Sequence, residues 1–130
     1  MENRYLFKAK RIDNRKWVQG YLYGIWEKRY ILWGMTNDMP NMIEVDPSTI
    51  CQCTDLKDRN GNLIWENDLV NCLNEECCGY IGWNESEAGF YFNVLLEDGR
   101  VEEEHLYDYQ EDVEVIGNKF DNQELLEVQE

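Results

Sequence analysis

Short segments rich in aromatic and β-branched residues recur along this chain of 130 residues, and turns rich in glycine, asparagine and aspartate separate them. Residues 17–23 place Trp17, Tyr21 and Tyr23 on one face, which is the period-2 alternation of a strand. Alanine, the strongest helix former, occurs only at positions 9 and 88, so long helices are not expected. The sequence therefore predicts a mostly β protein with minor α content.

The same pattern predicts where the strands begin and end. Residues 4–10 and 17–23 are expected to form a hairpin, and the Asn60-Gly61 pair predicts a sharp turn within residues 58–62. Residues 34–42 are predicted to be a loop, and residues 122–127 one or two helical turns after the cap Asp121 or Asn122. Further strands are predicted at residues 29–33, 42–45, 68–73, 79–83, 89–96 and 112–117, with a turn at 97–100.

Strands of this length and spacing are typical of a small closed or half-closed barrel. A chain of 130 residues is long enough to bury a core as one domain without disulfides or metals. The residue composition and charge of the chain change near residues 46–55, although no flexible linker lies there. We therefore expect a single domain, 1–130, that contains an N-terminal antiparallel β region of about residues 1–50 and a barrel region of about residues 51–130.

Charge is divided unevenly between the two halves. The formal net charge is −15; residues 1–65 carry 10 Lys+Arg and 8 Asp+Glu, whereas residues 66–130 carry 2 and 19. An acidic surface of this strength repels nucleic-acid phosphates and anionic lipids, and it attracts basic proteins. The acidic half is therefore not expected to bind nucleic acid or membrane directly. The charge also keeps a small protein soluble, whether or not it selects a partner.

Cysteine usage indicates the compartment. The five cysteines, at positions 51, 53, 72, 77 and 78, form an odd set, and neither a signal peptide nor an apolar run of membrane-spanning length is visible. We expect a reducing cytoplasm and free thiols. Zinc sites usually pair cysteines as Cys-x-x-Cys, a spacing that is missing here, so these thiols are expected to be structural.

Catalytic constellations are not apparent. The only histidine, His105, follows three glutamates that favour a cationic, exposed imidazole, which is a poor general base. The acids Asp108, Glu111, Asp112 and Glu114 lack the spacing of a calcium loop, and phosphate-binding glycine loops are absent. We assign no catalytic, cofactor-binding or metal residue, expect no cofactor, and rank an enzyme behind binding functions.

The first half combines basic and aromatic residues. Single-stranded nucleic acids are bound by such mixtures, because bases stack on aromatic rings and cations meet phosphates. The same pattern also fits strands that bury one face in a core and wet the other. The residues concerned are Trp17, Tyr21, Tyr23, Trp26, Tyr30 and Trp33, with Lys8, Lys10, Arg11, Arg15, Lys16, Lys28 and Arg29.

One long segment resembles a known family. Residues 52–70 read QCTDLKDRNGNLIWENDLV. They resemble the hallmark of the YopX family of phage and prophage proteins, approximately Q-x-T-G-L-K-D-x-N-G-x-x-I-(aromatic)-E-G-D-I-V. The opening RYLFKAK at residues 4–10 and EVIGNKFDN at residues 114–122 are similar to the start and end of that family. Asp55 and Asn67 stand where the family has glycine, and both residue types tolerate left-handed backbone.

The resemblance implies an origin in a phage or prophage of a bacterial host, and a second part similar to an SH3-like barrel. It implies no activity or catalytic residues. The segment around residues 56–70 is interpreted as a structural signature, because its Gly, Asn and Asp residues are those that turns require. A ligand groove beside it is the other interpretation.

Two classes of function follow. The first is a non-catalytic protein-binding or adaptor module whose acidic half selects a basic partner, and which should expose an apolar patch rimmed by charge. The second is a nucleic-acid-related accessory protein, either an acidic decoy of a DNA-binding host protein or a weak single-strand binder through its basic aromatic half. Self-association is also expected, since edge strands and aromatic surfaces of small β proteins often pair.

Overall fold

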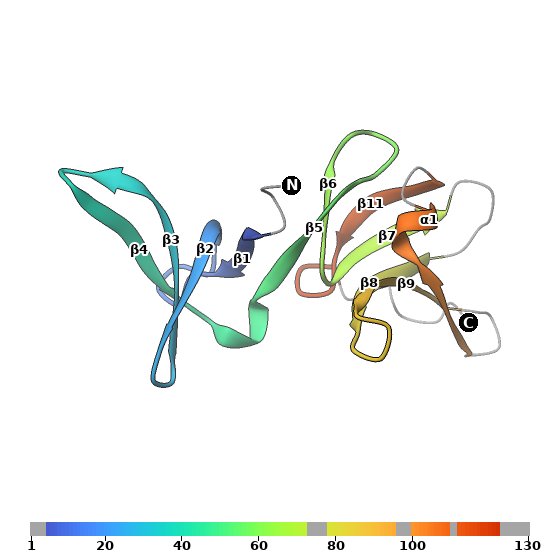
Figure 1. The fold of residues 1–130 in the computed structure, drawn as a ribbon, viewed down its shortest axis with the longest axis horizontal. Helices are drawn as coiled ribbons and strands as arrows, with labels where there is room; N and C mark the ends of the chain where they lie inside the picture. Colours follow the sequence, from blue (N-terminus) through green and yellow to red (C-terminus); the bar gives the residue numbers. More distant parts are fainter. Residues whose placement is uncertain (1–4, 73–77, 96–99, 110–111, 123–130) are drawn as a thin grey trace. The chain divides into compact units, whose positions relative to one another are not determined.

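The computed structural model describes residues 5–72, 78–95, 100–109 and 112–122. It confirms the mostly β prediction, with strands in two antiparallel sheets of order β4-β3-β2-β1-β5-β6 and β10-β9-β8-β7-β11. The chain divides into two compact units, unit 1 at residues 1–53 and unit 2 at residues 54–130 (Figure 1). No helix in the described parts is long and apolar enough to cross a membrane.

Unit 1 is an antiparallel meander whose last strand returns beside its first. Phe7 pairs with both Gly20 and Gln52, which puts β1 between β2 and β5. The Arg11–Val45 bridge brings the end of β4 back to the end of β1. The elements are β1 (Phe7–Lys10), β2 (Trp17–Ile25), β3 (Lys28–Thr36), β4 (Met39–Val45), the 3-10 turn η2 (Pro47–Thr49) and the first residues of β5 (Cys51–Lys57). The predicted hairpin of residues 4–10 and 17–23 is confirmed for the described residues.

A small core lies inside this meander. Ala9, Ile31 and Val45 are fully buried and come from β1, β3 and β4, and four half-buried side chains pack against them. Gly20 lets two strands approach, because a Cβ at this position would lie 2.2 Å from the carbonyl oxygen of Leu32. The half-buried side chains are Phe7, Val18, Ile43 and Ile50.

The prediction of a loop at residues 34–42 is wrong. This segment forms the hairpin of β3 and β4, because Asn37 and Asp38 form a two-residue turn with φ of 53° and 63°, the left-handed values that a type I′ turn requires. A shift of register at Gly34, whose φ is 55°, accommodates the extra residue of β3. Pro40 lies in β4, the edge strand of the sheet, where a missing N–H is tolerated.

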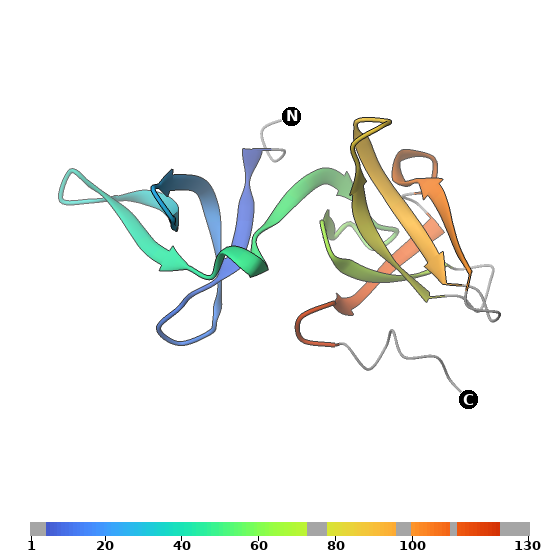
Figure 2. The ribbon, with the colours of Figure 1, turned by 90° about the horizontal axis from the view of Figure 1, so that it is seen from below.

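Unit 2 contains a four-stranded meander completed by a strand from its far end. After β10 and the short helix α1, the chain returns so that β11 pairs antiparallel with β7 (Figure 2). In the strand order of this sheet, β10 and β11 are the two outer strands, so the sheet is open. The elements are β6 (Leu63–Trp65), β7 (Asp68–Cys72), β8 (Cys78–Asn84), β9 (Gly89–Leu95), β10 (Val101–His105), α1 (Leu106–Tyr109) and β11 (Val113–Asn118).

The strands predicted in this half match β7, β8, β9 and β11, apart from residues 73 and 96, which lie outside the described residues. The predicted turn at 97–100 and the helical tail at 122–127 also lie almost entirely outside them. Four elements were not expected, namely β5, β6, β10 and α1.

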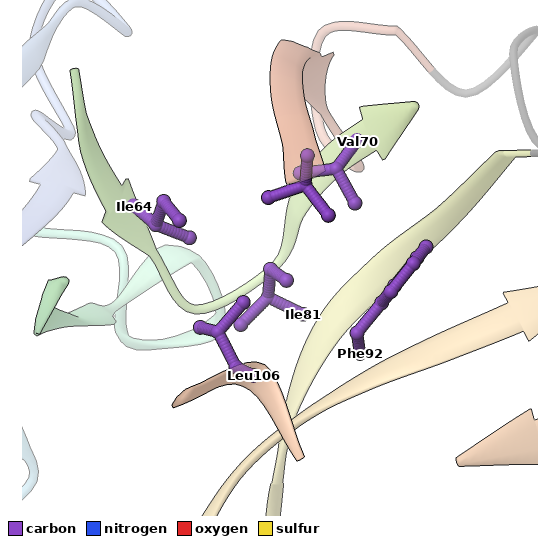
Figure 3. Close-up of a cluster of buried hydrophobic side chains, with 6 residues drawn as sticks. Ile64, Val70, Ile81, Phe92 and Leu106 are labelled. Carbon is purple, nitrogen blue, oxygen red and sulfur yellow. The ribbon is translucent and has the colours of Figure 1, made fainter. Parts of the chain in front are cut away.

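The core of unit 2 is larger than that of unit 1. Ile64, Val70, Ile81, Phe92 and Leu106 point toward one another from β6, β7, β8, β9 and α1 (Figure 3). Val113 of β11 completes this buried cluster. Since these side chains come from nearly every element of the unit, their burial holds the sheet, the helix and β6 together.

Candidate functional site

Three polar residues of the YopX-like hallmark, Thr54, Asp58 and Asp68, are buried and bonded to backbone. Thr54 Oγ1 donates to the carbonyl oxygen of Ile64 at 2.7 Å and accepts from the N–H of Leu56 at 3.1 Å. Asp68, only 2% exposed, accepts a hydrogen bond from the N–H of Trp65 at 2.8 Å. These groups satisfy the backbone around the turns and are therefore not presented to a ligand.

Asp58 is the centre of this hydrogen-bond network. Its carboxylate accepts from the backbone N–H groups of Asn60, Asn62 and Val115, each at 2.9 Å. Burial alone would raise the pKa of Asp58, but the hydrogen bonds from Val115, Asn62 and Asn60 outweigh it, so its pKa is lowered. The carboxylate thereby ties the Asn60-Gly61 turn, where Gly61 has φ of 83°, to strand β11.

Asp55 and Asn67 occupy the two hallmark positions where the resemblance expects glycine. Their φ values are 63° and 71°, so both backbones are left-handed, as the residue types allow. With Ile64, Leu69 and Val70 fully buried as well, the hallmark segment stabilises the fold. This supports the interpretation of the hallmark segment as a structural signature.

The thiols and the histidine do not come together in the described residues. Cys51 and Cys53 are buried on β5, and the thiol of Cys51 donates to the carbonyl oxygen of Thr49 at 3.3 Å. His105 is exposed on β10, where its Nε2 lies 3.0 Å from the hydroxyl of Tyr91. Burial and the charges of Glu87 and Glu103 raise the pKa of Tyr91. The tautomer of His105 decides which of the two groups donates this hydrogen bond. Cys77 and the side chains of Cys72 and Cys78 lie outside the description.

The candidate calcium ligands are likewise engaged or dispersed. Glu114 Oε2 accepts from the side-chain amide of Asn60 at 3.0 Å and lies 3.8 Å from Arg59 Nε, so it belongs to the hallmark turn. Asp108 and Asp112 are exposed, and residue 111 is not described. Over the described ranges, no group of three or more His, Cys, Asp or Glu side chains has the geometry to hold a metal ion. Buried side-chain nitrogen and oxygen atoms there all have hydrogen-bond partners.

Exposed apolar side chains instead gather in unit 1, along the hairpins of β2, β3 and β4. Met35 and Met39, which are 65% and 68% exposed, lie beside the β3–β4 turn, where Met39 pairs with Thr36 and Met35 with Pro40. We call the exposed residues Trp33, Met35, Met39 and Met42 of this hairpin the methionine patch. Sequence analysis missed it, although Asn37-Asp38 is a recognisable two-residue hairpin turn.

A tryptophan projects from the turn between β2 and β3, at the other end of β3. Trp26 is 89% exposed and has φ of 54°, a left-handed value that costs a residue with a Cβ atom free energy. The guanidinium of Arg29 donates to the carbonyl oxygens of Trp26 and Lys28, both at 3.0 Å, and so holds the turn together. The turn therefore displays a large apolar ring in a backbone conformation that favours glycine or asparagine.

Replacing Trp26 with asparagine is expected to stabilise the protein by about 1 kcal/mol, because asparagine adopts left-handed backbone at lower cost and the exposed ring contributes little burial. A shift of the urea midpoint to higher concentration would show this. The neighbouring Glu27 does not have a positive φ, so Glu27→Asn is the matched control and should leave the midpoint unchanged. An equal shift for both variants would contradict the strain at Trp26.

Cations and aromatic rings share one face of the unit 1 sheet. The ammonium groups of Lys8 and Lys10 lie 4.9 and 5.5 Å from the ring centroid of Trp17. Lys8 pairs with Gln19, which is two residues from Tyr21 on the same strand, and Tyr23 pairs with Tyr30 at a ring distance of 6.3 Å. We call Lys8, Lys10, Trp17, Tyr21, Tyr23 and Tyr30 the aromatic–lysine face.

The structure separates this face from the other basic and aromatic residues of the first half. Arg11 forms an ion pair with Asp13 at 2.7 Å, and Arg15 one with Asp46 at 3.0 Å. Trp33 lies three residues beyond Tyr30 on β3 and hence on the opposite face. Basic and aromatic side chains of the first half therefore do share one face of the sheet, but only some of the predicted residues belong to it.

Acidic side chains of unit 2 line an outer strand. Glu102 and Glu103 of β10 are exposed, and Glu103 accepts a hydrogen bond from the side chain of Asn84 at 2.9 Å. Because β10 is at the end of the strand order, these charges border an outer edge of the sheet as far as the described strands define it. Charged edge strands resist pairing with other chains, and they also present a negative field to approaching proteins.

Comparison with known proteins extends this description. Residues 6–127 match the family described as YopX protein, so the match includes both units and nearly all of the chain. None of the curated proteins compared with the chain matches it. The matched span contains the buried Thr54, Asp58 and Asp68 as well as the exposed hairpins of unit 1. The chain therefore belongs to the YopX family.

Proposed function

We propose that this YopX-family protein is a non-catalytic adaptor that binds another protein through the methionine patch. The observation that carries the proposal is the exposure of four large apolar side chains on one hairpin. Exposed apolar clusters mark interaction sites, and flexible, polarisable methionines adapt to the shape of a partner. Asp38, in the turn between β3 and β4, places a charged group beside Met35 and Met39, as expected of an adaptor surface bordered by charge.

The acidic unit 2 favours a basic partner. Residues 54–130 carry 4 Lys+Arg and 21 Asp+Glu, and exposed glutamates line β10. Opposite charge accelerates association and discriminates against acidic proteins, while apolar contacts supply most of the affinity. Binding of such a partner should therefore weaken as ionic strength rises.

The proposal also includes an SH3-like barrel for unit 2 and action inside a bacterial host. The β7–β10 meander, the short helix α1 and the return of β11 to β7 are the strand sequence of an SH3-like barrel, and this topology supports that assignment for unit 2. The resemblance to phage and prophage proteins supports action in the cytoplasm of a bacterial host. The hydrogen-bonded, buried state of the hallmark residues supports a binding role over a catalytic one.

Affinity capture tests the adaptor. The tagged protein is incubated with nuclease-treated bacterial lysate at low and high salt, and retained proteins are identified by mass spectrometry and then titrated in purified form. We expect a basic protein that is held at low salt and released at high salt. The double variant Met35→Ser, Met39→Ser should weaken its binding at least tenfold, since it removes two of the four apolar side chains of the patch, one from each face of the hairpin.

Ile12→Ser is the matched control, because Ile12 is a half-exposed apolar residue of unit 1 outside the patch. It should bind the partner as the wild type does. If Ile12→Ser weakened binding as much as the methionine variant, the patch would not be the site. Capture of the protein by itself alone, with a dimer in light scattering, would replace the adaptor by a homo-oligomer.

A further inference from the structure

We infer that the aromatic–lysine face of unit 1 binds single-stranded nucleic acid. This site is distinct from the methionine patch, and it rests on a different observation. The strand register puts three tyrosines, one tryptophan and two lysines on one side of the sheet formed by β1, β2 and β3. The core of the unit lies on the other side, where Ala9 and Ile31 are buried.

The rings are available for stacking along β2. Tyr21 and Tyr23 are 57% and 45% exposed, and they follow one another on the same face of the strand. Alternate residues of a strand are about 7 Å apart, which leaves room for one base on each ring. Tyr30 extends the row onto β3, where its ring is tilted by 44° to that of Tyr23. Any base can stack on such rings, so the binding should be tolerant of sequence.

The cations lie at both ends of the aromatic row. Lys8 and Lys10 stand beside Trp17, and Lys28, which pairs with Ile25, lies on the same face beyond Tyr23. Three ammonium groups along a row of rings match a chain in which phosphates alternate with bases. Bases paired inside a duplex do not offer their faces, so a double strand should bind more weakly than a single strand.

Charge segregation makes this site compatible with a strongly acidic protein. Residues 1–53 carry 8 Lys+Arg and 6 Asp+Glu, so the negative charge belongs to unit 2. On this face itself, the register places Lys8, Lys10 and Lys28 against Glu44, which pairs with Tyr30, so positive charge exceeds negative charge beside the rings.

Fluorescence anisotropy of a fluorescein-labelled 20-nucleotide oligothymidine, titrated with the full chain, tests the inference. Oligothymidine is chosen because it forms no duplex with itself. We expect a Kd of about 10–100 µM at 50 mM salt. With three lysine contacts, binding should fall about 20-fold between 50 and 200 mM salt, because the logarithmic slope is about −0.7 per contact on a single strand.

Three double variants separate stacking from charge. Tyr21→Ala, Tyr23→Ala should weaken binding at least tenfold, whereas Tyr21→Phe, Tyr23→Phe should retain it, since phenylalanine keeps the aromatic ring. Lys8→Gln, Lys10→Gln should reduce the loss between 50 and 200 mM salt to about threefold. The control Tyr107→Ala removes a tyrosine of unit 2 that is 72% exposed, and it should bind like the wild type.

Circular dichroism of each variant shows that its fold is intact. The inference is overturned if the oligonucleotide gives no signal at 200 µM protein and 50 mM salt, or if folded alanine and phenylalanine variants bind equally. It is also overturned if a labelled duplex binds as tightly as the single strand. None of these outcomes depends on the methionine patch, so the adaptor proposal stands or falls separately.

Discussion

Replacing Asp58 with alanine is expected to lower the free energy of unfolding by about 3–4 kcal/mol, a large part of the stability of a small domain. The change removes three hydrogen bonds from a carboxylate and leaves the N–H groups of Asn60, Asn62 and Val115 without their acceptor. Urea denaturation followed by circular dichroism measures the difference. The urea midpoint should fall markedly, and the slope should stay similar if the folded state keeps its compactness.

Asp58→Asn is the graded comparison. Asparagine keeps an oxygen for Asn60 and Asn62 but turns an NH2 group toward the N–H of Val115, so a smaller loss is expected. The folded pKa of Asp58 is lowered, so its stabilisation is complete above the unfolded value near 4 and disappears as the pH falls through the folded value. The difference between wild type and Asp58→Asn should therefore be constant from pH 7 to about pH 5 and narrow below about pH 4. A constant difference down to pH 2 would contradict the role of the charge.

Replacing Gly79 with alanine is expected to cost about 2–3 kcal/mol through overpacking. A Cβ there would lie 2.1 Å from Cε1 of Phe92 and 2.4 Å from the carbonyl oxygen of Asn93. The ring of Phe92 is fully enclosed by the core of unit 2, and the carbonyl is part of the β8–β9 ladder, so neither moves without disturbing its neighbours. Thermal and urea unfolding should both register the loss.

Gly89, on the facing strand β9, provides the control. A Cβ at this position meets its nearest atom, the carbonyl oxygen of Glu87, at 3.8 Å, and its φ is not in the left-handed range. Gly89→Ala should therefore change stability by less than about 0.5 kcal/mol, or raise it slightly by restricting the unfolded chain. Equal losses in the two variants would mean that strand propensity and not the space around Gly79 decides the effect.

Strands with clear alternation and local turn signals were predictable from the sequence. The β1–β2 hairpin and the Asn60-Gly61 turn depend on residues close together in the chain, and the structure confirms both. The positive φ at Asp55 and Asn67 was also expected, because short polar side chains replace glycine there. These features are determined by residues that are near one another in the sequence, so distant contacts are not required to predict them.

Other strands were missed because their patterns contradict strand propensity. The residues of β10 include Glu102, Glu103 and Glu104, a residue type that is depleted in strands, and pairing with β9 overrides this preference. The residues of β5 mix cysteine, threonine and aspartate without a clear apolar alternation. Their strand structure comes from partners such as Phe7 of β1, far away in sequence.

The candidate surfaces were also not predictable in full, because they depend on strand pairing. Sequence alone gathered thirteen basic and aromatic residues of the first half without ordering them, since strand register decides which side chains share a face. The register selects seven of them for one side of the sheet, namely the six residues of the aromatic–lysine face and Lys28, and leaves Trp33 on the opposite side. The methionine patch was hidden because the segment that carries Met35 and Met39 was interpreted as a loop.

The bond from Asp58 to Val115 has a consequence for synthesis on the ribosome. Asp58 emerges early, but its partner strand β11 is the last described strand of the chain, so this bond forms only after nearly all of unit 2 has been made. Until then, Val113 is missing from the cluster around Phe92, and apolar surface stays open to water. A nascent chain therefore gains the bond that ties its hallmark turn to β11 only near the end of translation, and a product truncated before residue 113 is expected to be a target of proteolysis.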